Sequence, residues 1–304
     1  MRTDDDSWGI AGKVGSTALA TAMVRAAENV RSGGLFTDPF AQCFLDAAVA
    51  QGWRNPYATE AWHRNDYEDP ATAAFRQAST DCAVCRTRFI DDFLRAGTDR
   101  QVVLLAAGLD TRAWRLPWTE GSVVYELDQP GVLDFKSETM AAHATRPSAR
   151  RCAVPIDLRD DWPAALLAAG FDSTAPAVWV AEGLVPYLPP TGQDVLFERI
   201  TSLSAPGSRL IVDVYGPEFY EPERLRAMFA RMNQTTREEV YSTEELFFSG
   251  DRADVAEWLA GHGWTTTAAP TLDVMAELGR PAPDDMPAGA LSDFFVSAHR
   301  VAQG

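Results

Sequence analysis

The sequence is almost without lysine. Only Lys13 and Lys136 occur among its 27 basic residues, and the rest are arginines. Enzymes that form a Schiff base with their substrate, or that use a Tyr-x-x-x-Lys pair, depend on a lysine. No Tyr-x-x-x-Lys occurs in the chain. Lysine-dependent chemistry is therefore strongly disfavoured.

Long hydrophobic runs and a secretory signal are also missing. No run of about 18 apolar residues occurs, and the segment MRTDDDSWGI carries three aspartates where a signal peptide carries positive charge. The cysteines are too few and too scattered for a disulfide framework; they are Cys43, Cys82, Cys85 and Cys152. We expect a cytoplasmic protein with reduced thiols.

Cys82 and Cys85 form a CxxC, a spacing that occurs in zinc and redox sites. No second CxxC and no histidine pair at metal-ligand spacing accompanies them. We interpret the two cysteines as packed on the inner face of a helix, and we predict no metal site.

Positive charge is scarce overall. Acidic residues outnumber basic ones by 43 to 27, and the formal net charge is −16. Such a chain repels a nucleic-acid backbone or an anionic membrane at long range, so neither is expected as the main partner. With 304 residues and 46% hydrophobic content, the chain is long enough for one large α/β domain or for two small domains.

The hydrophobic pattern predicts two regions. Residues 1–95 are expected to be helical, with one helix from Ser16 that ends at Gly33-Gly34, a second after Asp38-Pro39 with the proline in its first turn, and a third over about 72–95. From residue 101 short apolar runs alternate with helical stretches, notably 191–204 and 253–262. The predicted strands are 101–106, 122–127, 151–156, 177–181, 209–214, about 264–271 and 293–299.

Continuous apolar runs are typical of parallel strands that are covered on both faces, and their alternation with helices predicts a doubly wound sheet. The interval 217–250 is too long for an ordinary connection, so we expect one or two helices over the C-terminal edge of the sheet. We therefore divide a single domain, 1–304, into a helical cap (1–95), a core (96–216), a lid insertion (217–250) and a C-terminal part with a helix and the last strands (251–304).

Four successive strands end in glycine or in an acid. Gly108 follows the first strand, Asp128 ends the second 20 residues later, Asp157 follows the third and Glu182 the fourth. Ligands of open α/β sheets bind at this edge, and a carboxylate at the position of Asp128 suits two ribose hydroxyls. Asp157, with the backbone N–H of Leu158, suits an adenine edge.

Two of these acids have a structural alternative. Asp128 could cap a helix or sit at a solvated strand end, and Asp157 could cap the helix around Trp162.

A phosphate site is absent from this edge. The chain contains no GxGxxG and no GxxxxGK[ST], and acids surround the place where a pyrophosphate would lie. This counts against the main enzyme alternative, an NAD-dependent oxidoreductase. A nucleoside with a positive or zwitterionic tail, such as S-adenosylmethionine, fits better.

A cation is needed for the carboxylate of that tail, and "CRTRF" offers Arg86 and Arg88. On a helical wheel Arg86 lies roughly 60° from the centre of the apolar stripe of this helix, and Arg88 roughly 100° away on the other side. We predict that Arg86 reaches inward to bind the carboxylate, and that Arg88 forms a surface or helix–helix ion pair.

Five segments resemble one family. They are "RTRFIDDF", "LLAAGLDTRAWRL", "VYELDQPGVLDFK", "IDLRDDW" and "AEGLVPYLPP". Together they resemble the bacterial branch of the leucine carboxyl methyltransferase-like family of S-adenosylmethionine-dependent methyltransferases. The resemblance is strong over about 14–215. It implies a Rossmann-like class I methyltransferase fold, with a doubly wound seven-stranded sheet, an antiparallel last strand and an N-terminal helical layer that closes the cofactor pocket.

The same resemblance implies roles for seven residues. The methionine carboxylate would lie on Arg86, the methionine part beside Ala107 and Gly108, and the amino group near Glu182. The ribose would lie on Asp128, and the adenine on Asp157 and Leu158.

The chain departs from the family pattern at Pro186, where relatives have a bulky aliphatic residue or methionine, and this puts the wall near Tyr187 in question. A cofactor-binding lysine of the eukaryotic members is not transferred to Lys13, because the bacterial motif offers Ser16 and Thr17 there.

Oxygen is the expected methyl acceptor, on a small molecule or a peptide. A carboxylate is already ionised at neutral pH, whereas a hydroxyl needs a base, and the four histidines are poor candidates. This mildly favours a carboxylate, and no catalytic residue is assigned. Tyr187, Tyr215 and Phe219 are expected to line the acceptor site, with core packing as the alternative. The four histidines that are poor base candidates are His63, His143, His262 and His299.

The other hypothesis for the chain is a protein that binds the cofactor and acts through a partner without catalysis.

Overall fold

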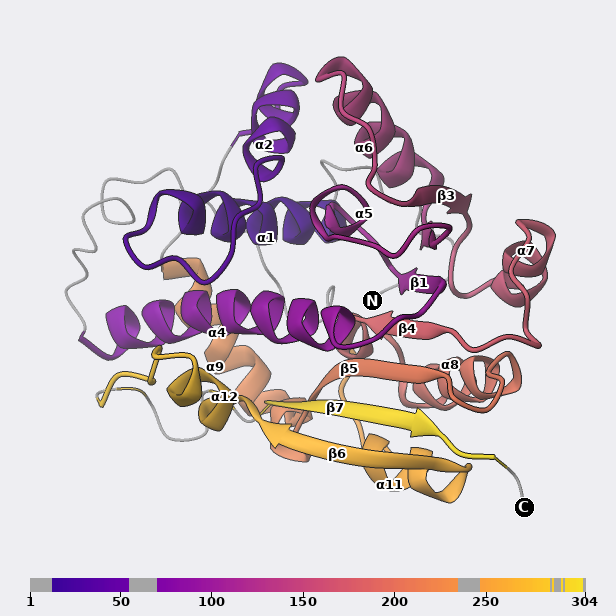
Figure 1. Ribbon diagram of the computed structural model, residues 1–304. Helices are drawn as coiled ribbons and strands as arrows, with labels where there is room; N and C mark the ends of the chain where they lie inside the picture. The colour runs from indigo at the N-terminus through magenta and orange to yellow at the C-terminus, as the bar shows by residue number, and fades with distance from the viewer. Residues whose placement is uncertain are drawn as a thin grey trace.

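The strands form one seven-stranded sheet in the order β3-β2-β1-β4-β5-β7-β6 (Figure 1). The computed structural model describes residues 13–54, 70–234, 247–284, 286, 291 and 293–302. The strands are β1 (Gln101–Leu105), β2 (Val123–Asp128), β3 (Arg150–Pro155), β4 (Val178–Ala181), β5 (Arg209–Tyr215), β6 (Trp264–Pro270) and β7 (Asp293–Arg300).

Strand direction follows the predicted pattern. The pairs β1–β2, β2–β3, β1–β4 and β4–β5 are parallel, whereas β7 runs antiparallel to both β5 and β6. The chain moves outward from β1 to β3 and then returns to the other side of β1 with β4. This reversal places the switch point of the sheet between β1 and β4, where open α/β sheets bind their ligands. The class I methyltransferase sheet with an antiparallel last strand is confirmed.

Helices cover both faces of the sheet. The helices are α1 (Lys13–Val30), α2 (Ala41–Ala50), α4 (Pro70–Arg95), α5 (Arg112–Arg115), α6 (Pro130–Ala142), α7 (Trp162–Ala168), α8 (Pro190–Ser202), α9 (Pro222–Gln234), α11 (Val255–Gly261) and α12 (Thr271–Glu277), with 3-10 turns η1 (Val185–Tyr187) and η2 (Pro217–Tyr220). None of the helices in the described ranges combines the length and the apolar character needed to cross a membrane.

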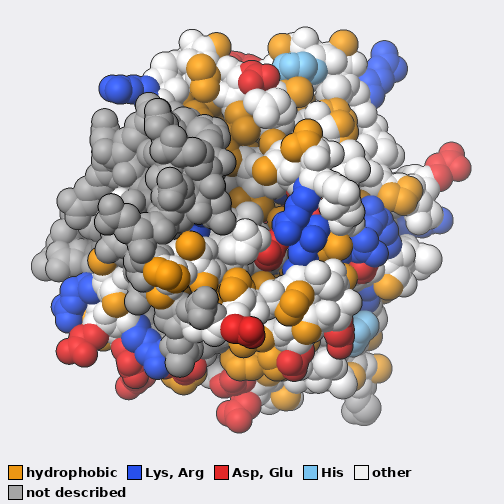
Figure 2. Space-filling model, turned by 90° about the vertical axis from the view of Figure 1, so that its left-hand side faces the viewer, with side chains coloured by type: hydrophobic (Ala, Val, Ile, Leu, Met, Phe, Trp, Pro, Cys, Tyr) orange, Lys and Arg blue, Asp and Glu red, His pale blue; other side chains and the backbone are white. Residues whose placement is uncertain are grey.

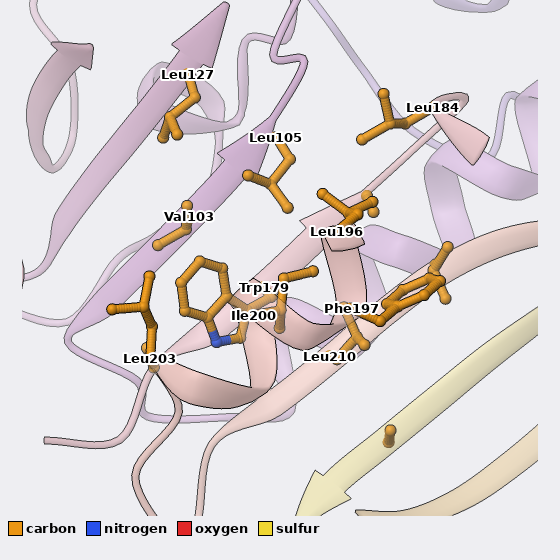
Figure 3. Close-up of a cluster of buried hydrophobic side chains, with 14 of the residues drawn as sticks. Val103, Leu105, Leu127, Trp179, Leu184, Leu196, Phe197, Ile200, Leu203 and Leu210 are labelled. Atoms are coloured by element: carbon orange, nitrogen blue, oxygen red, sulfur yellow. The ribbon is translucent and has the colours of Figure 1, made fainter. Parts of the chain in front are cut away.

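Alternation along the strands gives each face its own core. On one face Val103 and Trp179 pack against α7, α8 and α11, and Figure 3 shows the Trp179 indole among aliphatic side chains of β1 and α8. On the other face Val102 and Val178 pack against α1, α2, α4 and α6. Both faces are buried because successive side chains point to opposite sides. The predicted continuous apolar strands are therefore confirmed for β1 and β4.

The N-terminal layer is joined to the sheet by a buried arginine. Arg25 of α1 donates to the backbone oxygen of Leu109 at 2.8 Å and to Asp38 at 2.7 Å, while Asp38 also accepts a hydrogen bond from Thr111. These contacts hold α1 against the turn that follows β1. The expected helical cap therefore closes over the carboxyl end of the sheet.

Two local expectations were wrong, and one helix was not predicted. Pro39 does not lie in the first turn of α2, because the helix begins at Ala41 with Phe40 as its N-cap. β3 is an edge strand and leaves several side chains exposed, so it is not covered on both faces. The helix α12 was not predicted; it starts directly after β6, in a stretch for which no element was predicted.

Trp179→Ala should destabilise the fold strongly. The indole is fully buried and packs edge-on against Trp162 at a centroid distance of 6.2 Å. Its removal leaves a large cavity, and we expect the free energy of unfolding, measured in urea, to fall by about 3–5 kcal/mol. Val30→Ala is the control, because Val30 is 88% exposed; an equally small loss in both variants would contradict the described core.

Candidate functional site

A cavity of about 1600 Å³ opens at the carboxyl ends of the parallel strands. These ends face the left of Figure 1, and Figure 2 looks onto that edge, where hydrophobic side chains line a hollow with arginine and acidic side chains beside it. Side chains of α1, α4, η1, α8 and the segment after β5 also line the cavity. The predicted cofactor residues all lie along it; they are Arg86, Ala107, Gly108, Asp128, Asp157, Leu158 and Glu182.

The turn after β1 has an unusual backbone. Ala106 and Gly108 have φ angles of 50° and 45°, in the left-handed region that favours glycine. The N–H of Gly108 donates to Asp128 Oδ2 at 2.6 Å. This bond links the end of β1 to the end of β2. Glycine suits the position because it adopts a positive φ angle without strain.

Asp128 is fixed by backbone donors rather than by a cation. Its second oxygen accepts a hydrogen bond from the N–H of Gln129 at 2.7 Å. Burial raises the pKa of the Asp128 carboxyl, and the two backbone N–H groups offset part of that rise. The N-cap of α6 is Gln129, so the alternative of Asp128 as a helix cap is not supported. The carboxylate oxygens can still accept further hydrogen bonds.

Arg86 lies between two carboxylates. Its Nε donates to Glu182 at 3.0 Å and one terminal nitrogen to Asp213 at 3.0 Å. The other terminal nitrogen makes no hydrogen bond to the described residues. Arg88 instead pairs with Asp92 on its own helix and donates to the Leu35 carbonyl oxygen. The two side chains are therefore oriented as the helical wheel predicts, Arg86 inward and Arg88 outward, while the binding of a ligand carboxylate by Arg86 stays a prediction.

Glu182 joins two arginines. One oxygen accepts from Arg86, and the other accepts from Arg112 at 2.7 Å. Burial acts to raise the pKa of Glu182, but Arg112 and Arg86 outweigh it and the pKa is lowered. Arg112 also pairs with Asp110 and, at 2.8 Å, with Asp91. Asp110 and Arg112 brace the turn that follows β1, and Arg112 extends that brace to α4 through Asp91 and to the end of β4 through Glu182.

Sequence reasoning missed the acids behind Arg86. Asp213 is 2% exposed, accepts from Arg86 and also accepts from the N–H of Gly183 at 2.6 Å. Asp293 lies on β7 and accepts a hydrogen bond from the Cys82 thiol at 3.4 Å. The available signal was an acid inside an otherwise apolar strand, as in "RLIVDVY".

Asp157 is held by a neighbouring cation. It forms an ion pair with Arg159 at 2.7 Å and accepts from the side chain of Gln129 at 3.1 Å. Although burial acts to raise the pKa of Asp157, the hydrogen bonds from Arg159 lower it. The N-cap of α7 is Asp161, so Asp157 is not the cap of the helix at Trp162. Leu158 lies beside it at the cavity.

The three predicted acceptor residues come together. Tyr215 and Phe219 stack with their ring centroids 4.1 Å apart, and Phe219 and Tyr187 both pack against Phe247. All four line the cavity. The neighbouring Pro186 is buried and accepts a backbone hydrogen bond from Phe248, so this departure from the family pattern still leaves Tyr187 at the cavity.

Other candidate groups do not gather into a second site. Cys85 is buried, and no group of three histidine, cysteine or acidic side chains able to hold a metal ion occurs among the described residues. None of the described histidines lines the cavity; His143 and His262 contact their own helices. His63 lies outside the described residues.

The residues present fit S-adenosylmethionine. A carboxylate at the end of β2 suits a ribose, an arginine with an open donor suits an amino-acid carboxylate, and no glycine-rich phosphate cradle occurs in the described turn.

Comparison with known proteins decides the family. The sequence model of the family described as leucine carboxyl methyltransferase matches residues 18–201. The chain belongs to the leucine carboxyl methyltransferase family. A relative from Mycobacterium avium (strain 104), named "Putative S-adenosyl-L-methionine-dependent methyltransferase", is 46% identical over 98% of this chain and 98% of its own. A relative of the same name from Mycobacterium tuberculosis (strain ATCC 25177 / H37Ra) is 45% identical over 99% of both chains.

A solved structure supports the fold. The crystal structure of a protein from Thermobifida fusca YX, titled "putative methyltransferase", matches with a TM-score of 0.50 and 17% identity, over 92% of this chain and 94% of that one. As a leucine carboxyl methyltransferase family member, the protein is an S-adenosylmethionine-dependent methyltransferase. The cofactor supplies a methyl group on a sulfonium sulfur, and the chain has to bind it, orient it and exclude water.

Asp128→Ala should weaken cofactor binding. The loss of a carboxylate for the ribose hydroxyls is expected to raise the Kd for S-adenosylmethionine at least about tenfold, or ~1.4 kcal/mol, in a calorimetric titration. Asp134→Ala on the exposed face of α6 is the matched control. An unchanged Kd for Asp128→Ala would show that the ribose assignment is wrong.

Arg86→Ala should affect only ligands with an amino-acid end. Because a charge-assisted hydrogen bond is lost, we expect S-adenosylhomocysteine to bind at least about tenfold more weakly. The binding of 5′-methylthioadenosine, which lacks that end, should change little. Arg88→Ala is the control; a larger effect of Arg88→Ala than of Arg86→Ala, or equal losses for both ligands, would contradict the assignment.

Proposed function

We propose that this enzyme transfers the methyl group to an oxygen atom, either a carboxylate or a hydroxyl oxygen, of a small-molecule or peptide acceptor. The family description, leucine carboxyl methyltransferase, names an oxygen acceptor for the relatives that define it. A carboxylate needs no base, whereas a hydroxyl that is held in line with the methyl group still has to lose its proton to a base. Oxygen is therefore the acceptor atom that agrees best with the family and with the site.

The observation that carries this proposal is the extension of the cavity beyond the cofactor residues. Its continuation is formed by η1, the end of β5 and the insertion that follows β5. Tyr187, Tyr215 and Phe219 are proposed as the wall that contacts the acceptor. In this arrangement the lid insertion, rather than the shared sheet, determines which acceptor enters.

The test is methyl transfer from cofactor with a labelled methyl group. The purified protein is incubated with a panel of small carboxylic acids, phenols and peptides, and the products are treated with mild base. A methyl ester releases labelled methanol under these conditions, whereas a methyl ether keeps its label, so the two oxygen acceptors are distinguished.

Asp128→Ala is the negative control for this assay. Transfer of the label to nitrogen or sulfur compounds alone would contradict the proposal. Tight cofactor binding without transfer to any acceptor would favour a protein that acts through a partner.

A further inference from the structure

The cavity is larger than one cofactor requires. Pockets that enclose a drug-sized ligand typically measure about 300–1000 Å³, whereas this one measures about 1600 Å³. Apart from Arg86 on α4, the residues expected to bind the cofactor lie at the ends of β1, β2, β3 and β4. The remaining volume lies toward β5, η1 and the insertion, where a second molecule can be accommodated.

Aromatic rings dominate this second part of the cavity. The ring of Phe219 stacks on Tyr215, lies 5.6 Å from Phe247 and edge-on to Tyr220 at 5.2 Å. Phe247 in turn contacts Tyr187 at 5.0 Å. We call the four cavity-lining rings of Tyr187, Tyr215, Phe219 and Phe247 the aromatic wall.

The aromatic wall is only half-buried. Each of its four side chains keeps intermediate exposure, although all of them line a cavity rather than the outer surface. Phe229, which also lines the cavity, and Leu225 are buried and pack against the wall. Half-exposed rings inside a cavity are apolar surface that a ligand can cover, and flat rings pack best against another flat ring.

The aromatic wall borders one acidic side chain, Asp293. Tyr215 is the cross-strand neighbour of Asp293 in the β5–β7 pairing, and Asp293 also lines the cavity. Asp293 is 7% exposed; its Oδ2 accepts a hydrogen bond from the Cys82 thiol, and its Oδ1 is buried without a hydrogen bond from the described residues. The hydroxyl of Thr271 is close by without bonding geometry. No ion pair to Asp293 occurs in the described part of the chain, in contrast to Asp213, which pairs with Arg86.

We propose that the acceptor is a planar aromatic hydroxyl compound, a phenol, whose ring packs on the aromatic wall and whose polar edge faces Asp293. This inference rests on the proposed transfer to oxygen and selects the hydroxyl over the carboxylate. An aromatic carboxylate would place a second negative charge beside Asp293, which lines the cavity and has no ion pair within the described residues, and this is costly in a poorly solvated site. A neutral hydroxyl instead has a proton to donate to a carboxylate.

The inference reverses a preference drawn from the sequence. The absence of a convincing histidine base favoured a carboxylate acceptor. Asp213 and Asp293 change this preference, and their side chains are brought together only by the pairing of β5 with β7.

Binding to the protein saturated with S-adenosylhomocysteine tests the inference without requiring turnover. We compare 2-naphthol, 2-naphthoate and decahydro-2-naphthol by calorimetry, because they differ in charge or in planarity at similar size. We expect 2-naphthol to bind at least about tenfold more tightly than either of the others. Tighter binding of 2-naphthoate, or equal binding of the saturated alcohol, would overturn the proposal.

Two variants assign the preference to the named residues. Phe219→Leu keeps an apolar side chain and should weaken 2-naphthol binding while leaving the saturated alcohol unchanged. Asp293→Asn should raise the affinity for 2-naphthoate relative to 2-naphthol, and Asp273→Asn, an exposed acid on α12, should not. Equal changes for all three probes would contradict the roles of these side chains.

The binding comparison and the transfer assay fail in different ways. If 2-naphthol binds with the expected preference but the labelled methyl goes only to nitrogen or sulfur acceptors, the proposed oxygen transfer is wrong while the aromatic site stands. If oxygen compounds are methylated but the three probes bind equally, the aromatic hydroxyl class is wrong and the transfer to oxygen stands.

Discussion

The sharing of one carboxylate between two arginines holds this site together. Glu182 follows β4 and accepts from Arg86 on α4 and from Arg112 after the β1 turn. These three segments are far apart in the sequence, and each of them lines the cavity. A buried carboxylate with two cationic partners remains ionised, and each arginine is oriented by a fixed oxygen. The shape of the pocket therefore depends on α4 and the ends of β1 and β4 keeping their positions relative to one another.

Arginine suits this arrangement better than lysine does. Its planar group can donate to two carboxylates at once and still keep a donor for a ligand, as Arg86 does between Glu182 and Asp213. Arg25 uses the same property to join α1 to the β1 turn. The near absence of lysine, which first indicated only which chemistries are excluded, thus agrees with a buried framework built from arginine–carboxylate pairs.

Local patterns predicted the strands and the residues at their ends well. Gly108, Asp128 and Glu182 each follow a short apolar run, so a buried parallel strand and its carboxyl end could be located without knowing any long-range contact. The partners of these residues could not be predicted in this way. Asp213 contacts Arg86 across 127 positions, and Arg25 contacts Leu109 across 84, and no local spacing encodes such pairings. The start of α2 was also misplaced: the helix begins at Ala41, and Asp38 accepts from the N–H of Phe40 and from Arg25 of α1.

A crystal structure with S-adenosylhomocysteine bound would test the central claim most directly. The account predicts that the amino-acid carboxylate of the ligand lies on Arg86, and that Glu182 still accepts from both Arg86 and Arg112. The ribose hydroxyls should lie within hydrogen-bond distance of Asp128. A ligand whose carboxylate is bound away from Arg86, or a Glu182 that has left either arginine, would contradict it.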